Sequence, residues 1–121
     1  MKRIGDDFVF CDDPLRVYLA EVRRVPPLER VEEIECIEHV RAGDETAEAA
    51  KLRLVEAHLE LVVTLAERYR RDDVHILDLI QKGNEGLLRA AQTLADSRPD
   101  SFAAHATPQI ECALADIVKN V

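Results

Sequence analysis

Apolar residues recur every three or four positions along most of the chain, with polar residues between them, which is the pattern of amphipathic helices. The first such segment, residues 14–24, follows an aspartate and begins with a proline, two features of a helix start. The prolines within residues 25–27 interrupt the pattern, because proline has no amide hydrogen to donate. A second helix is predicted over residues 29–41, and Gly43 suits the left-handed residue that ends a helix.

The longest uninterrupted helical pattern lies in the middle of the chain. Residues 46–71 contain neither glycine nor proline, so the sequence predicts one helix of about 26 residues and about 40 Å. Val55 and Leu59 lie on one apolar stripe of this helix, and Leu54 and Leu61 lie on a second. Because two sides of the helix are apolar, we expect it to pack centrally, between neighbours.

The last third of the chain predicts two further helices. One covers residues 76–91 despite two glycines, Gly83 and Gly86, which cost helix stability. Glycines at such positions indicate a close backbone approach, either by a partner or by a neighbouring helix. Residues 97–107 predict a loop, after which Pro108 predicts the first turn of the final helix.

Together these segments predict an all-α fold, a compact bundle of about five helices with a long central helix, in which residues 1–121 form a single domain. The 24 acidic against 16 basic residues give a net charge of −8, which opposes non-specific binding to phosphate backbones and favours a protein partner. No apolar stretch approaches the roughly 20 residues of a membrane span, and the N-terminus lacks a secretory signal, so we expect a cytoplasmic protein.

One segment goes beyond a general helical pattern. Residues 77–87, LDLIQKGNEGL, resemble the helix by which bacterial sigma factors of the sigma-70 family bind core RNA polymerase. Residues 53–63 and 66–70 resemble the long helix that precedes it in primary sigma factors. The family's region 1.2 is matched, in order, by residues 13–19, 24–26, 32–35 and 42–44. The resemblance covers residue 13 to about residue 114 and implies the helical fold of sigma regions 1.2 to 2.3, with region 2 forming most of it.

For residues 77–87, the resemblance implies docking on the clamp coiled coil of core RNA polymerase. The residues expected to take part are Asp78, Leu79, Gln81, Lys82, Asn84, Glu85 and Leu88. The polar residues three, six and seven positions after Asp78 share its helix face and can offer acceptors and amides to an arginine-bearing partner. Two positions depart from the family, because Lys82 stands where an acid is usual and Glu85 where an apolar residue is usual.

The segment that opens promoter DNA in this family departs further. Aligned on the phenylalanine, the chain has these residues at the DNA-melting positions: Phe102, His105, Pro108, Gln109, Glu111 and Cys112. The first is the only aromatic residue left, since the family's two tryptophans and its tyrosine are replaced, as are its arginine and its base-reading glutamine. Because stacking contributes about 1–3 kcal/mol per base, we expect promoter melting and base recognition to be lost and contact with promoter DNA to be weak or absent.

No catalytic arrangement stands out, so we expect neither an enzyme nor a bound metal or cofactor. Cys36 and His39 lie one helical turn apart, but the two further ligands of a structural zinc are not evident. The acid at Asp72 is explained by helix capping. With Cys11 and Cys112, the cysteines are odd in number and scattered, which favours free thiols.

The leading hypothesis is therefore a sigma-70-like domain for transcription initiation or its regulation, which binds core RNA polymerase and no longer melts promoters. Two alternatives stay open. The first is a functional sigma fragment that still contacts promoter DNA. The second is a helical interaction module that binds an anti-sigma protein or a second copy of itself.

Overall fold

The computed structural model describes residues 13–97 and 101–119 and confirms the all-α prediction. Within these residues the chain forms six α-helices, one 3₁₀ turn and no strand. The elements are α1 (Pro14–Val22), α2 (Arg30–Ala42), α3 (Ala47–Ala57), α4 (Leu59–Glu67), α5 (Ile76–Thr93), the 3₁₀ turn η1 (Leu94–Asp96) and α6 (Phe102–Lys119). In the part of the chain described, no helix has the length and apolar character needed to cross a membrane.

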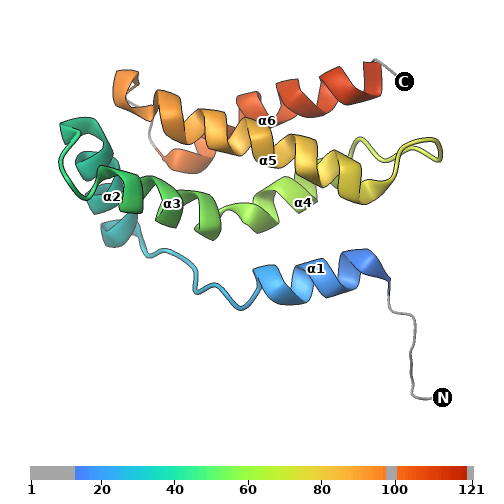
Figure 1. The fold of residues 1–121 in the computed structure, drawn as a ribbon, viewed down its shortest axis with the longest axis horizontal. Helices are drawn as coiled ribbons and strands as arrows, with labels where there is room; N and C mark the ends of the chain where they lie inside the picture. Colours follow the sequence, from blue (N-terminus) through green and yellow to red (C-terminus); the bar gives the residue numbers. More distant parts are fainter. Residues whose placement is uncertain (1–12, 98–100, 120–121) are drawn as a thin grey trace.

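The α5 helix lies at the centre of the bundle, with α6 along one side and the consecutive helices α3 and α4 along the other (Figure 1). The α2 helix packs against α3 and η1 at one end, and α1 lies beside α4 and α5 (Figure 1). The largest fully buried side chains come from α3, α4, α5, η1 and α6: Leu54, Val62, Leu79, Leu87, Leu94, Phe102, Ile110 and Leu114. Their burial packs α5 closely between its neighbours.

The predicted start of the first helix and the predicted role of Gly43 at the end of the second are confirmed, whereas the first helix ends at Val22, before the predicted residue 24. The Leu15 amide donates to Asp13 Oδ1 at 3.0 Å, and Pro14 is the first residue of α1. The α2 helix ends at Gly43, whose φ of 63° lies in the left-handed region that glycine adopts without strain.

The prediction of one long central helix is wrong, because His58 separates α3 from α4. The His58 amide bonds to the Val55 carbonyl at 3.0 Å, three residues back instead of four. The His58 side chain donates from Nδ1 to the Leu54 carbonyl at 2.7 Å. The imidazole thus replaces the backbone donor that a continuous helix would supply to the Leu54 carbonyl, so this carbonyl stays paired where the helix is interrupted.

The final helix starts earlier than predicted. It begins at Phe102, so the predicted loop is too long and Pro108 lies inside α6. The Phe102 amide donates to Glu33 Oε2 of α2 at 3.1 Å, and the Ala104 amide donates to Ser101 Oγ at 3.1 Å. These two acceptors satisfy donors at the start of the helix. Together with burial of the Phe102 ring, they outweigh the hydrogen bond that the proline removes.

The two glycines of α5 allow neighbouring helices to pack closely. A Cβ atom at Gly83 would lie 2.6 Å from Val62 Cγ1 on α4. A Cβ atom at Gly86 would lie 2.6 Å from the Gln109 carbonyl oxygen on α6. Both glycines are buried. The sequence allows close approach at these glycines either by a partner or by a neighbouring helix. The structure shows the approach of neighbouring helices.

Candidate functional site

The outer side of α5 carries a straight row of exposed side chains. Its members, alternately three and four residues apart, are Asp78, Gln81, Glu85, Leu88 and Gln92. The opposite side of the helix is buried in the core. At 1.5 Å per residue the row is about 21 Å long. We refer to these five residues as the α5 row.

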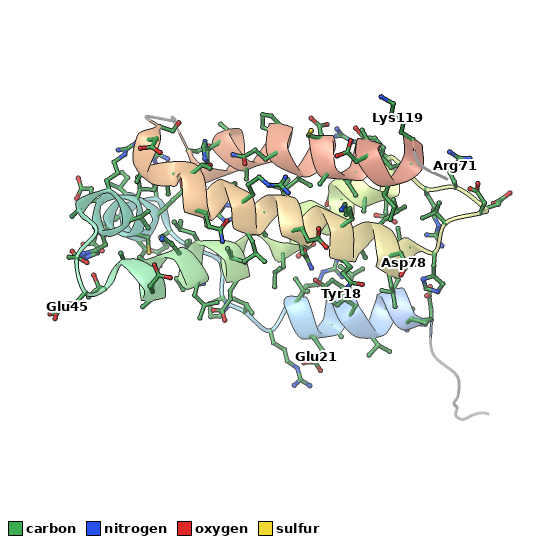
Figure 2. All side chains as sticks on the ribbon, turned by 45° about the horizontal axis from the view of Figure 1, so that its top comes forward. Tyr18, Glu21, Glu45, Arg71, Asp78 and Lys119 are labelled. Carbon is green, nitrogen blue, oxygen red and sulfur yellow. The ribbon has the colours of Figure 1, made fainter. Side chains whose placement is uncertain are left out.

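Local contacts fix the start of α5 and therefore the position of Asp78. The Leu77 amide donates to His75 Nδ1 at 3.1 Å, which caps the helix. The Ile76 side chain is buried beside this cap. Asp78 lies in the first turn, where the partial positive charge of the helix N-terminus favours a carboxylate. In Figure 2, Asp78 lies near the end of α5 that is next to α1, and Tyr18 lies on the side of α1 that faces α5.

Two of the residues predicted to contact a partner lie elsewhere. The prediction for Leu79 is corrected, because its side chain is 0% exposed and belongs to the core. Asn84 is half-buried, and its Nδ2 donates to the Tyr18 hydroxyl of α1 at 3.2 Å. The predicted shared face therefore holds for Asp78, Gln81 and Glu85, whereas Asn84 is turned toward α1.

The two departures from the family pattern form an ion pair with each other. Lys82 Nζ lies 3.3 Å from Glu85 Oε1, and the two side chains are 38% and 52% exposed. An exposed pair of this kind contributes about 0–1 kcal/mol. The Glu85 carboxylate thus stays accessible to a partner.

A groove between α3 and α5 continues the α5 row. Its volume is about 270 Å³, and it is lined by Glu48, Lys51, Leu52, Val55, Leu88, Ala91 and Gln92. Val55 and Ala91 are buried beneath it. Leu52 and Leu88 are 56% and 49% exposed, although both are large and apolar.

Three residues that shape these surfaces are absent from the sequence prediction. Leu52 lines the groove, and its signal in the sequence is an apolar residue between Lys51 and Arg53. The Tyr18 hydroxyl accepts a hydrogen bond from the side-chain amide of Asn84, a residue predicted to contact the partner. Glu33 caps α6 from a distant helix, and no pattern along the chain indicates such a contact.

The positions aligned with DNA-melting residues divide between the interior and the surface of α6. The Phe102 ring is 0% exposed and makes an edge contact with His58, with the ring centroids 4.9 Å apart. Pro108 and Cys112 are exposed, and Glu111 is partly exposed. The one aromatic ring of this segment is therefore in the core, and its outer side carries none.

The other two of these positions are engaged in the seam between α5 and α6. His105 Nε2 donates to the Ala90 carbonyl of α5 at 2.9 Å. Gln109 Nε2 donates to Thr93 Oγ1 of α5 at 3.2 Å. Both side chains are half-buried, and their hydrogen bonds link α5 to α6.

Within residues 13–97 and 101–119, no three His, Cys, Asp or Glu residues are grouped as they would be around a metal ion. Burial raises the pKa of the Cys36 thiol, and Cys112 is exposed, while Cys11 lies outside the described residues. His39 Nδ1 lies 2.8 Å from Asp44 Oδ2. This hydrogen bond raises the pKa of His39, and it is the main cause that lowers the pKa of Asp44 to about 2.

Comparison with known proteins matches most of the chain to one family. Residues 54–119 match the family model of sigma-70 region 2, and residues 13–46 match that of the sigma-70 factor region 1.2. RNA polymerase sigma factor SigA of Lactococcus lactis subsp. cremoris is 43% identical over 99 residues, which cover 82% of this chain and 27% of that protein. SigA of a Bacillus species is 40% identical over 114 residues, which cover 85% and 29%. The chain thus spans less than a third of the length of these curated relatives.

Proposed function

The chain belongs to the sigma-70 family of RNA polymerase sigma factors, and on that basis we propose that it acts in transcription initiation by binding core RNA polymerase through the α5 row. The observation that carries the proposal is the row itself. It combines carboxylates, amides and a leucine in one exposed line on a helix whose other side is fixed in the core. The expected target is the clamp coiled coil of the polymerase.

A helical partner suits the shape and chemistry of the row. A helix lying alongside α5 would meet Asp78, Gln81 and Glu85 in succession over about 10 Å. Carboxylates accept charge-assisted hydrogen bonds from arginine, which are about twice as strong as neutral ones. Because the inner side of α5 is packed in the core, binding need not order its backbone, which lowers the entropy cost of docking.

We further propose that promoter melting is lost. Three features of α6 support this: the Phe102 ring is buried, His105 and Gln109 are bonded to α5, and Lys119 is the only Lys or Arg of the helix. Unpaired bases need exposed rings for stacking, and the phosphate backbone needs positive charge. The domain would therefore bind the polymerase without opening DNA, as a regulator that competes with a sigma factor able to do both.

The proposal is tested by titrating core RNA polymerase of the host into the fluorescently labelled chain. The test variant combines Asp78→Ala, Gln81→Ala and Glu85→Ala. Each hydrogen bond to a charged group contributes about 1.5–3 kcal/mol, so the loss of two carboxylates weakens binding about 100-fold or more.

The matched control combines Glu35→Ala and Glu38→Ala on α2. This control also removes two negative charges, but from exposed helical positions outside α5. We expect this control to bind as the unchanged chain does. Equal affinities for the test variant and the unchanged chain, or no binding by the unchanged chain, would refute the proposal. Tight binding to an anti-sigma protein in place of the polymerase would select the interaction-module alternative.

A further inference from the structure

We infer that the groove between α3 and α5 receives an apolar side chain from the same polymerase helix that lies on the α5 row. This inference rests on the proposed function and deepens it. It assigns a binding role to Leu52, a residue of α3 outside the segment that carries the docking resemblance.

The groove is continuous with the α5 row. Leu88 and Gln92 belong both to the α5 row and to the lining of the groove. The row runs for about 15 Å from Asp78 to Leu88. A partner helix that follows the row in a straight line therefore reaches the groove without bending.

The groove is small and exposes apolar surface. Leu52 and Leu88 keep about half of their surface in contact with water, at 56% and 49% exposure, above the buried Val55 and Ala91. Covering such apolar surface is favourable. The volume of about 270 Å³ lies below the roughly 300–1,000 Å³ of small-molecule sites. It suits a protein side chain, such as that of Leu, Met or Phe.

The charges around the groove favour one kind of occupant. The Glu48 side chain at the groove is 87% exposed, and the row adds Asp78 and Glu85. The two nearby lysines are engaged within the chain, Lys51 with Glu48 at 2.8 Å and Lys82 with Glu85 at 3.3 Å. Each of these pairs is neutral as a whole, so the preference for a helix whose apolar side chain is flanked by basic residues rests on Asp78 of the row and on the net charge of −8 of the chain.

A second copy of the chain fits the groove poorly. The net charge of −8 opposes self-association. The exposed apolar residues of α2, Val31 and Ile34, lie on a helix rich in acids. Bringing that helix to the groove would place like charges against Glu48, which is unfavourable.

The test compares three single variants in the titration with core RNA polymerase. Leu52→Gln removes the apolar side chain without adding charge, and Leu52→Met keeps an apolar side chain of similar volume. Val31→Gln also replaces an exposed apolar side chain with glutamine, but on α2, where Val31 is 67% exposed. We expect binding about tenfold weaker for Leu52→Gln, which corresponds to about 1.4 kcal/mol, and a change below about twofold for the other two.

The outcomes separate this inference from the proposed function. Unchanged affinity of Leu52→Gln, with binding lost in the variant of Asp78, Gln81 and Glu85, would overturn the inference and leave the proposed function standing. Absence of binding by the unchanged chain would overturn both. Sedimentation that shows a dimer which Leu52→Gln dissociates would also overturn the inference, because the occupant would then be a second copy. Circular dichroism and thermal melting show that each variant is folded.

Discussion

The α5 and α6 helices each have 18 residues and pack against each other, yet they differ in what they offer to a partner. The α5 helix keeps an exposed line of carboxylate, amide and leucine side chains. The α6 helix, at the positions where its family has DNA-melting residues, turns three side chains inward and exposes proline, cysteine and part of a glutamate. Under the proposed function, the same helical frame holds one binding surface on α5, while the neighbouring surface on α6 lacks the side chains that melting of DNA needs.

The reason lies in which residues carry the fold. The contact between the two helices depends on Gly86, Ile110 and Leu114, none of which belongs to either outer surface. The exposed positions of α6 contribute little to the core, so rings and basic residues can be replaced there at little cost in stability. Phe102 is different, because its ring fills the core, and its retention is explained by packing.

The largest expected effect concerns Phe102. Phe102→Ala should lower the free energy of unfolding by about 3–5 kcal/mol, because it leaves a cavity in the core. Urea denaturation followed by circular dichroism measures this loss. Pro108→Ala at an exposed position of the same helix should not destabilise the protein, since alanine restores a helix donor. If Phe102→Ala were as stable as the unchanged chain, the ring would not be needed for packing of the core.

The glycines of α5 give the next effect. Gly86→Ala should cost about 3 kcal/mol, because the added Cβ meets the backbone of α6 at 2.6 Å and the two helices must move apart. Gly83→Ala should cost about 1 kcal/mol, since the atom it meets is a methyl group of Val62 and alanine favours the helix. The same denaturation experiment ranks the two variants. The reverse order would contradict the packing described for α5 and α6.

A smaller loss of stability is expected when the cap of α6 is removed and that of α5 is left in place. Glu33→Ala removes the acceptor for the Phe102 amide and should cost about 1 kcal/mol. Hydrogen exchange should accelerate in the first turn of α6 and stay unchanged in α5, whose own cap is His75. Binding to core RNA polymerase should not change, because the α5 row is untouched. Weaker binding would show that α6 takes part in docking.

The smallest effect is the pH dependence of the pair formed by His39 and Asp44. The pKa of His39 is raised above its ordinary 6.5, so its contribution to stability is present below pH 6.5 and is lost as the pH rises through the raised value. The pKa of Asp44 is lowered to about 2 from 3.8, so its contribution is present above pH 3.8 and is lost as the pH falls toward 2. The stability difference between the unchanged chain and His39→Gln should therefore shrink between pH 6 and pH 8.

Because this pair lies at the turn between α2 and α3, polymerase binding should not follow its titration. Binding that weakens between pH 6 and pH 8, and does so less in His39→Gln, would place the turn in the interface. High salt is the second check, since a solvent-exposed pair of this kind is screened.

Patterns along the chain predict the fold class, the start of α1, the end of α2 and the exposed face of α5. These features depend on local spacing and capping, as at Asp13 and Gly43. The break at His58 and the early start of α6 escape such patterns. The first depends on an imidazole that replaces a backbone donor, and the second on a carboxylate from α2.

The candidate site is predicted in part for the same reason. Helical spacing identifies Asp78, Gln81 and Glu85 as neighbours, but it cannot show that Asn84 turns toward Tyr18. The groove at Leu52 requires α3 and α5 to lie side by side, which no single helix pattern contains.

One paired titration tests together whether the chain binds the polymerase and whether it has lost its contact with promoter DNA. The labelled chain is titrated with core RNA polymerase and, in the same buffer at physiological salt, with a forked promoter duplex. We expect saturable binding to the polymerase and no binding to the duplex. Capture of the duplex with an affinity that falls as salt is raised, without binding to the polymerase, would contradict both expectations.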